Sequence, residues 1–451
     1  MESNLNRVHI IAMGGSVMHA LAIALKKQGV AITGSDDSFF NPSKARLEEH
    51  DLLPDKEGWF PENIDDTIDV VLLGMHAHED NAELVRAQEL NLTIMSFPEF
   101  IYSQSKNKQR LVVAGSHGKT TITSMIMHVL KFHNRAFDYV VGAKVPGFAE
   151  TVKLSDAPVI IIEGDEYLSS RIDPTPKFLR YHHHIGLISG IAWDHVNVFP
   201  TEDDYVRQFD LFADNSPKAG SLVYNDEDAL APVIGSKERD DVRRLPYTTH
   251  PHEIVDGITY LIDGDERVKL KIFGKHNLLN LSGAKEVLKR LSITQDNFYD
   301  AIKSYQLPAL RLNVVKSNSN STIFRDYAHA PSKVEATAIA VKSQFPDRDL
   351  VGVYELHTYS SLNKDFLNRY ADTLKYCNEA IVYYNPEVIA QKKLTAFEPQ
   401  DVIDAFKHPH LRVCNDVAEL ENDLKAIELT GKNVLLMSSA NFGGLNINKL
   451  F

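Results

Sequence analysis

Apolar and polar positions alternate in blocks along this chain, with short apolar runs followed by segments of helical spacing. The apolar runs near the N-terminus predict buried strands at Val8–Ala12, Ala31–Gly34, Val70–Gly74 and Thr93–Ser96. Between the first two runs, Val17–Lys27 carries apolar residues at helical spacing. Strands that alternate with helices are typical of parallel sheets covered by helices, so we expect the α/β class.

Two further regions repeat this alternation. The polar segment Ser103–Arg110 predicts a linker, and Leu307-Pro308 precedes the third region, so we expect three domains at residues 1–107, 108–308 and 309–451. In the second region we expect a small antiparallel sheet within 220–275, strands at Leu111–Ala114, Val159–Ile162 and His184–Ser189, and helices at Lys119–Phe132 and Asn277–Leu291. In the third region we expect a hairpin or exposed loop at Lys316–Ser321 and strands at Ser321–Phe324, Leu350–Tyr354, Ala380–Tyr384 and Asn433–Met437.

Composition excludes several classes of protein. The 451 residues carry a formal net charge of −13, which argues against a nucleic-acid partner. No apolar stretch approaches the ~18–20 residues of a membrane helix, so no membrane insertion is expected. Two cysteines, Cys377 and Cys414, cannot form a disulfide framework, and the polar start Met1–Arg7 lacks the layout of a signal peptide. We expect a cytoplasmic protein that is a monomer or a weak dimer.

The strongest local signal is a strand that runs into a glycine-containing loop and then a helix. Glycines let backbone N–H groups face a phosphate, and the helix start adds partial positive charge. Lys119 offers a point charge to terminal phosphates, and the Thr120 hydroxyl suits Mg²⁺. Val113 stands where the strict phosphate-loop pattern has Gly or Ala, and a purely structural turn is the alternative. The predicted nucleotide-binding residues are Gly115, Ser116, His117, Gly118, Lys119, Thr120 and Thr121.

Acidic and histidine side chains follow two other strands. Glu163-Gly-Asp-Glu-Tyr167 ends an apolar strand and could hold Mg²⁺ beside the phosphates, although solvated acidic loops are common. Asp194-His195 follows a later strand, where a histidine is more often structural than a ligand.

Later polar motifs could contact a nucleotide. His276, Asn277 and Asn280 open a helix and could bind a base edge, with helix capping by Asn277 as the alternative. Asp326 and His329 follow a strand of the third region, where an ordinary turn is the alternative.

A glycine-rich loop follows the first strand, and an acidic residue follows the second. Gly14, Gly15 and Ser16 precede a helix and could accept a pyrophosphate, with Asp36 beside them. A dinucleotide-binding oxidoreductase would need three spaced glycines, and Ala12 and Val17 break that pattern.

Taken in order, these motifs resemble those of the Mur ligase family, the ATP-dependent amide ligases of peptidoglycan synthesis. The family's phosphate loop is matched by Gly115–Thr120, its glutamate by Glu163 and its Asp-His pair by Asp194-His195. Two more family motifs are matched by His276–Asn280 and Asp326–Pro331. The resemblance spans almost the whole chain. It implies a Rossmann-like UDP-binding domain, a P-loop ATPase-type central domain and a Rossmann-like C-terminal domain.

The resemblance also implies the site residues, with ATP and Mg²⁺ as cofactors. Lys119, Glu163 and His195 would be catalytic, and Thr120, Glu163 and His195 would be the metal ligands. A catalytically inactive binding protein of the same fold is disfavoured because Lys119, Glu163 and His195 are intact. The remaining implied contacts are His276, Asn277, Asn280, Arg311 and Asp326 for ATP, Gly14, Gly15, Ser16 and Asp36 for the UDP group, and His357, Tyr359 and Ser360 for the amine.

The substrates follow from the branch of the family. Phe209 stands where other branches carry a lysine, which points to members that act directly on UDP-N-acetylmuramate. Tyr167, Lys177–Tyr181 and Met437–Gly444 resemble members that attach the recycled tripeptide L-alanyl-γ-D-glutamyl-meso-diaminopimelate. The loop Glu355–Ser361 is closer to members that attach L-alanine. We therefore expect the tripeptide in peptidoglycan recycling, with L-alanine in peptidoglycan biosynthesis as the alternative.

Overall fold

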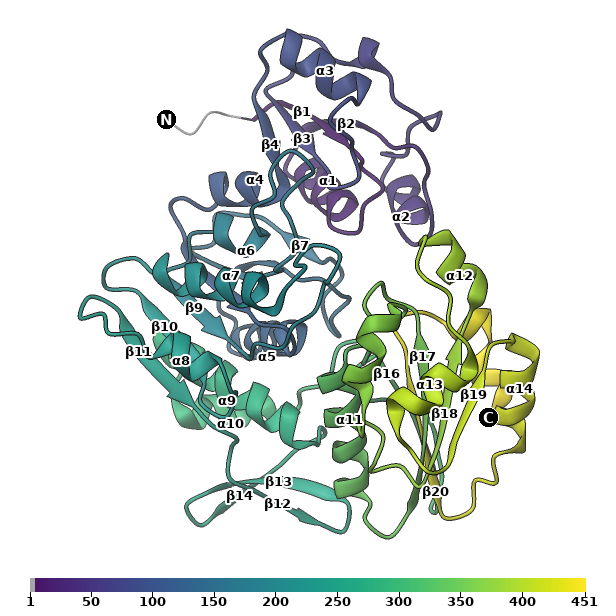
Figure 1. The fold of residues 1–451 in the computed structure, drawn as a ribbon. Coiled ribbons are helices and arrows are strands. Elements are labelled where there is room, and N and C mark those ends of the chain that lie inside the picture. Colours follow the sequence, from purple (N-terminus) through teal and green to yellow (C-terminus); the bar gives the residue numbers. More distant parts are fainter. Residues whose placement is uncertain (1–4) are drawn as a thin grey trace. The chain divides into compact units, whose positions relative to one another are not determined.

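The computed structural model describes residues 5–451, which form two compact units (Figure 1). The first unit runs to Ile191 and includes Val206–Tyr247 and Gly283–Thr294. The second contains Ala192–Tyr205, Thr248–Ser282 and Gln295–Phe451. Of the polar start Met1–Arg7, the first four residues lie outside the described part. No helix within 5–451 combines the length and the apolar character needed to cross a bilayer.

A four-stranded parallel sheet opens the first unit, in the order β2-β1-β3-β4. Its elements are β1 (Arg7–Ile11), α1 (Met18–Lys27), β2 (Ala31–Ser35), α2 (Ser43–Glu49), the 3₁₀ turn η1 (Pro61–Asn63), β3 (Val70–Leu73), α3 (Ala82–Glu89), β4 (Ile94–Ser96) and α4 (Phe97–Ser103). The four predicted strands are present. The second was predicted to be buried, and this was wrong: β2 pairs with β1 alone and is largely exposed.

A seven-stranded sheet follows in the same unit, in the order β11-β10-β9-β5-β8-β6-β7. All neighbouring strands are parallel except β7, which runs antiparallel to β6. The strands are β5 (Gln109–Ala114), β6 (Asp138–Val140), β7 (Val152–Lys153), β8 (Val159–Glu163), β9 (Ile185–Ile188), β10 (Ser221–Asn225) and β11 (Arg243–Tyr247). The helices of this region are α5 (Lys119–Phe132), α6 (Lys177–Arg180), α7 (Glu202–Asp214), α8 (Ala231–Gly235) and α9 (Lys275–Arg290).

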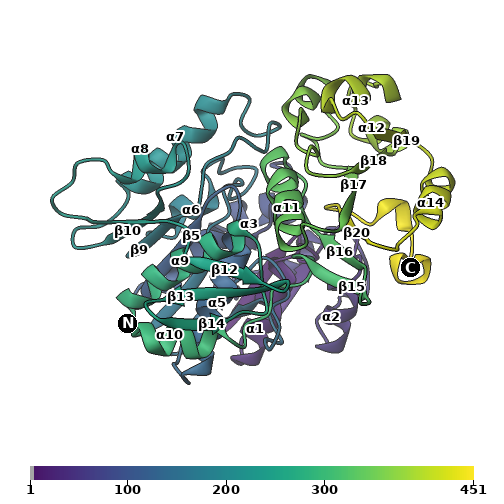
Figure 2. The same ribbon diagram turned by 90° about the horizontal axis from the view of Figure 1, so that it is seen from below.

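The small antiparallel sheet predicted within 220–275 is present only in part. β12 (His252–Val255), β13 (Ile258–Asp263) and β14 (Glu266–Lys269) form it in the second unit (Figure 2). The prediction was wrong for β10 and β11, which extend the parallel sheet. The reason is visible in β10, where every residue is buried, so the strand needs cover on both faces.

A six-stranded sheet completes the second unit, in the order β15-β16-β20-β17-β18-β19. The predicted hairpin is the antiparallel pair of β15 and β16, and the other neighbours are parallel. The strands are β15 (Asn313–Ser317), β16 (Thr322–Asp326), β17 (Asp349–Leu356), β18 (Glu379–Tyr384), β19 (Leu411–Cys414) and β20 (Lys432–Met437). The helices are α10 (Gln295–Ile302), α11 (Pro331–Gln344), η2 (Lys364–Tyr370), α12 (Pro386–Gln391), α13 (Pro399–Phe406), α14 (Val417–Ala426), η3 (Phe442–Gly444) and α15 (Ile447–Leu450).

Side-chain alternation along the strands gives this last sheet two separate cores. In β20, Leu435 joins the core that contains Val334 of α11, whereas its neighbour Val434 joins the core that contains Leu420 of α14. Successive strand residues point to opposite faces, so both faces are covered by helices. The α/β class with sheets rich in parallel pairing is thereby confirmed, whereas the domain limits at 107 and 308 stay predictions.

Candidate functional site

The phosphate-loop segment joins β5 to α5 at the carboxyl edge of the seven-stranded sheet. Gly115 and Gly118 have φ angles of +132° and +80°, which L residues rarely adopt. The Ser189 hydroxyl, after β9, donates to the His117 carbonyl oxygen and would overlap any side chain at Gly115. Ser116 is buried in the same turn. The loop geometry therefore depends on glycine at both positions.

Lys119, the first residue of α5, is held by two acceptors. Its Nζ donates to the Gly115 carbonyl oxygen and to Glu166 Oε2, each over 2.6 Å. Burial disfavours the charged ammonium, but Glu166, Asp165 and Glu163 outweigh that effect and raise the pKa of Lys119. The lysine is thus cationic and aimed at the loop interior, where it could meet an anion.

Thr120 and Glu163 contact each other directly. The Thr120 hydroxyl donates to Glu163 Oε1 over 2.8 Å, and the Gly142 backbone N–H donates to Glu163 Oε2 over 2.8 Å. Thr121 is buried one residue further along α5. A hydroxyl beside a carboxylate is the type of oxygen pair that Mg²⁺ takes.

Two ion pairs organise the segment after β8. Lys177 Nζ lies 2.6 Å from Asp165 Oδ2, and Arg180 contacts both oxygens of Asp173 at 2.8 and 2.9 Å. Burial would raise the pKa of Asp165, but Lys177 lowers it overall. The cations of the stretch that resembles tripeptide ligases are therefore engaged inside their own segment.

Asp194 is a buried carboxylate of the second unit that is surrounded by hydrogen-bond donors and cationic side chains. Its Oδ1 accepts the His195 backbone N–H at 2.7 Å and the Ser360 hydroxyl at 3.2 Å. Its Oδ2 lies 3.6 Å from His329 Nε2 and 3.9 Å from Lys333 Nζ. Burial opposes the charge, but His329, His195 and Lys333 hold the pKa of Asp194 well below its usual range. Asp194 therefore anchors three segments of this unit as an anion.

The predicted metal ligands divide between the two units. Thr120 and Glu163 belong to the first, and His195 belongs to the second. Their joint ligation of one ion stays a prediction.

The predicted adenine-binding residues lie at the start of α9. His276 is half-buried, burial lowers its pKa, and its buried Nδ1 atom has no hydrogen-bond partner within residues 5–451. Asn277 donates its side-chain amide to the Phe273 carbonyl oxygen over 2.8 Å, and Asn280 is buried. Asn277 is the third residue of α9 and donates rather than accepts, so this contact is not a helix cap, and the base contacts of His276, Asn277 and Asn280 stay predictions.

Asp326 and Arg311 take largely structural positions. Asp326 accepts the backbone N–H groups of Leu312 and Ala328, at 2.8 and 2.7 Å. The Arg311 guanidinium carbon lies 5.0 Å from the centre of the Tyr327 ring. Contacts of Arg311 or Asp326 with a nucleotide stay predictions.

The first glycine loop is closed by Asp36. The Gly14 backbone N–H donates to Asp36 Oδ2 over 2.7 Å, and Gly15 and Ser16 lead into α1. β2 ends one residue before Asp36, at Ser35. Burial raises the pKa of Asp36 to about 6. The Asp36 carboxylate therefore accepts the Gly14 backbone N–H, a donor that the sequence analysis assigned to a pyrophosphate. The contact of Asp36 with a uridine stays a prediction.

The predicted amine-binding residues follow β17. The His357 backbone N–H donates to the Ser361 hydroxyl over 3.0 Å, and Ser360 reaches Asp194. Tyr359 is 43% exposed, and Lys392 Nζ lies 4.2 Å from the centre of its ring. Tyr359 of this segment and Lys392, which follows α12, thus present an aromatic ring and an amine side by side.

Several functional candidates were not among the predicted site residues. Glu166 pairs with Lys119, Lys333 faces Asp194, and buried Glu355 accepts the Ser438 hydroxyl and the Phe442 backbone N–H. Lys333 follows His329 at the i+4 spacing of a helix start, a signal that could have been used.

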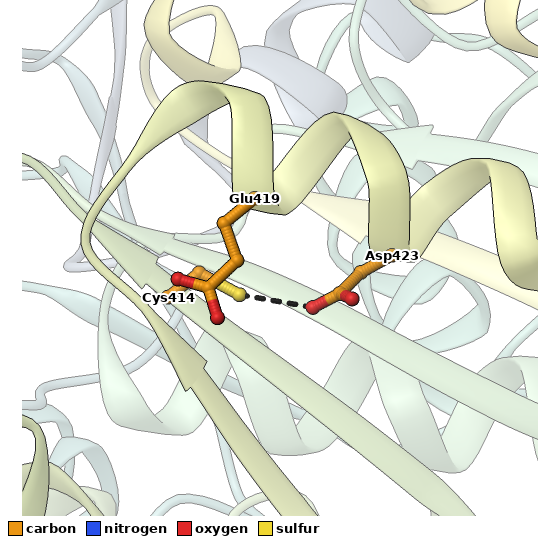
Figure 3. A group of neighbouring side chains, drawn as sticks. All are labelled: Cys414, Glu419 and Asp423. Atoms are coloured by element: carbon orange, nitrogen blue, oxygen red, sulfur yellow. Dashed lines mark hydrogen bonds between the residues drawn. The ribbon is translucent and has the colours of Figure 1, made fainter.

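Cys414, Glu419 and Asp423 lie close enough together to hold a metal ion, with Cys414 at the end of β19 and the carboxylates on α14 (Figure 3). The thiol donates to Asp423 Oδ2 over 3.1 Å, and burial raises its pKa to about 12. Arg412 already pairs with both carboxylates. A protonated thiol and compensated carboxylates make this a structural cluster.

Comparisons with known proteins give one consistent family. Residues 113–288 match the family model of the Mur ligase middle domain. The UDP-N-acetylmuramate–L-alanine ligase of Clostridium acetobutylicum is 29% identical over 382 residues, which cover 81% of each chain. The crystal structure of the UDP-N-acetylmuramate–alanine ligase of Thermotoga maritima has a TM-score of 0.70 at 19% identity and covers 97% of this chain and 96% of that one. The murein peptide ligase of Psychrobacter arcticus has a TM-score of 0.66 at 19% identity and covers 98% and 97%.

Proposed function

The chain belongs to the Mur ligase family and is an ATP-dependent ligase, and on this premise we propose that it joins a peptide amine to UDP-N-acetylmuramate. The observation that carries the proposal is the arrangement of Lys119, Thr120 and Glu163 around the phosphate loop. A cation and a hydroxyl at the start of α5, with a carboxylate at the end of β8 beside the hydroxyl, suit a bound nucleoside triphosphate.

The proposed reaction activates a carboxylate that is a poor electrophile in water. The muramyl carboxylate attacks the γ-phosphate of ATP, which releases ADP and forms an acyl phosphate. The amine then attacks the acyl carbon, and inorganic phosphate leaves as the amide forms. Lys119 would neutralise phosphate charge as the phosphoryl group transfers, a step that depends on positioning and electrostatics.

The oxygen donors near the loop fit a magnesium ion. Thr120 and Glu163 would hold it, with His195 as a further ligand from the second unit. The hydroxyl–carboxylate contact of 2.8 Å places two hard donors side by side. Bound there, Mg²⁺ would supply charge neutralisation between ATP and the muramyl carboxylate.

We further propose ligand contacts for residues of the second unit. His276, whose Nδ1 has no partner among residues 5–451, would bind the adenine edge together with Asn277 and Asn280. His357, Tyr359 and Ser360 would contact the amine substrate. In the first unit, Gly14, Gly15 and Ser16 would bind the UDP pyrophosphate, and Asp36 would then release the Gly14 N–H.

We propose the tripeptide L-alanyl-γ-D-glutamyl-meso-diaminopimelate as the amine, as in murein peptide ligases. The stretches around Tyr167, Lys177 and Met437–Gly444 support it. Glu355 ties the last of these stretches to the end of β17, beside the predicted amine loop. L-Alanine is the second candidate, because the matched relative of Clostridium acetobutylicum is a UDP-N-acetylmuramate–L-alanine ligase.

Phosphate release with UDP-N-acetylmuramate, ATP and Mg²⁺ tests the proposal, with both amines at equal concentration. A tripeptide site loses heavily when the distal groups are missing, because its buried polar partners are left unpaired. We expect kcat/KM for the tripeptide to exceed that for L-alanine. A higher value for L-alanine would assign the enzyme to the biosynthetic step, and no amine-dependent phosphate release would contradict the ligase proposal itself.

A further inference from the structure

A cavity of about 610 Å³ lies in the first unit at the edge of the seven-stranded sheet where β5, β9 and β10 begin. Because these strands are parallel and the phosphate loop follows β5, the cavity and the loop lie at opposite ends of the same strand. The cavity is therefore separate from the site described above. Its lining residues are Lys106, Asn107, Lys108, Gln109, His184, Ile185, Pro217, Lys218, Ala219, Gly220, Ser221 and Arg290.

All the charged residues that line this cavity are lysines or arginines. Lys106, Lys108, Lys218 and Arg290 contribute cations, and no lining residue is acidic, although the whole chain carries a net charge of −13. Lys108 is compensated by the buried carboxylate of Asp138. The other cations leave the cavity an electropositive site in an acidic protein, which concentrates anions.

Arg290 adds an unused donor to this positive field. It lies in the last turn of α9, and its buried Nε has no hydrogen-bond partner in the described part of the chain. The ring of His184 is engaged by Arg110 instead, since its Nδ1 accepts the Arg110 backbone N–H over 3.0 Å and its Nε2 lies 3.5 Å from Arg110 Nη2. An arginine with an unused donor, together with lysines, suits phosphate oxygens.

The rest of the lining is suited to an uncharged group. Ile185, Pro217 and Ala219 supply apolar surface beside the cations. The volume falls in the range of about 300–1,000 Å³ that is typical of small-molecule sites. We propose that this cavity binds a small organic phosphate, with its phosphate against Arg290 and Lys218 and its ring or sugar against the apolar surface.

Calorimetric titration of the full chain tests this, in a Lys119→Met background that weakens the phosphate loop. AMP serves as the organic probe and inorganic pyrophosphate as the anion without a ring. We expect AMP to bind, and Lys218→Ala/Arg290→Ala to weaken its binding by about tenfold or more, as lost charge-assisted bonds would. Gln109→Glu, which adds a charge at an exposed lining position without removing packing, should weaken it too.

The charge-matched control is Lys289→Ala/Lys303→Ala, which removes two lysines that each pair with a carboxylate three residues earlier. Thermal unfolding checks that each variant is folded. AMP binding that is equally weak in the control, or unchanged by Lys218→Ala/Arg290→Ala and Gln109→Glu, would overturn the proposal. So would pyrophosphate binding as tight as that of AMP, because pyrophosphate has no ring or sugar to use the apolar surface. These outcomes do not depend on ligase activity.

Discussion

Removing the Lys119 ammonium should lower both the stability of the fold and the rate of catalysis, and a second substitution should separate the two effects. Lys119→Met leaves Glu166, which is 1% exposed, without the cation 2.6 Å away and close to two more carboxylates. Breaking a buried ion pair by removing one partner costs about 3–5 kcal/mol, because the other charge stays buried without that counter-ion. Lys119→Met/Glu166→Gln removes that charge and should recover most of the lost stability.

Catalysis should respond differently. The lysine is the cation of the phosphate loop, and losing a charge-assisted contact to a transferring phosphoryl group should lower kcat about a thousandfold. The double variant restores stability but returns no cation, so its kcat should stay low. Urea unfolding measures the first effect, and coupled phosphate release under saturating ATP measures the second.

Lys108→Met is the matched control, since Lys108 also pairs with a fully buried carboxylate, Asp138. It should lose comparable stability and keep its turnover at a temperature where it is folded. Turnover of Lys119→Met within tenfold of the parent would refute the phosphate-loop assignment. A double variant no more stable than Lys119→Met would refute the ion-pair argument, whatever the activity.

Three further outcomes are expected. Burial raises the pKa of Asp36 to about 6, so the folded protein holds that proton to a higher pH than the unfolded chain, and stability falls as pH rises from about 4 to 6. Asp36→Asn should therefore be more stable than the parent at pH 7.5 and equal to it at pH 4 in urea unfolding, and equal midpoints at pH 7.5 would contradict this. Gly115→Ala should abolish ATP binding measured by calorimetry because its side chain would overlap Ser189, whereas Gly264→Ala, also at positive φ but in open space, should retain it. His195→Ala should raise the Mg²⁺ concentration needed for half-maximal phosphate release more than the ATP concentration; earlier melting with unchanged Mg²⁺ dependence would instead make His195 structural.

The sequence predicted most of the parallel strands because their apolar runs reflect burial on both faces. It misplaced β10 and missed β19. β10 is buried throughout, but polar Ser221 and Asn225 leave an apolar run of only Leu222–Tyr224, and turn residues lie nearby, so its burial was not evident. β19 pairs only with β18 and is partly exposed, so its apolar pattern is weak. Edge position and sheet membership depend on partners distant in sequence, and a local pattern does not contain them.

The ion pairs of the candidate site could not be predicted from local sequence patterns either. Motif order located Lys119 and Glu163, and helix and strand geometry then brought them to one edge of a sheet. Which carboxylate would hold Lys119 could not follow from spacing, since Glu163, Asp165 and Glu166 share one short segment. The choice of Glu166 depends on how the chain turns after β8, which the Lys177–Asp165 pair helps to fix. Lys177, from the stretch that resembles tripeptide ligases, thus pairs with the residue next to the counter-ion of the proposed catalytic lysine.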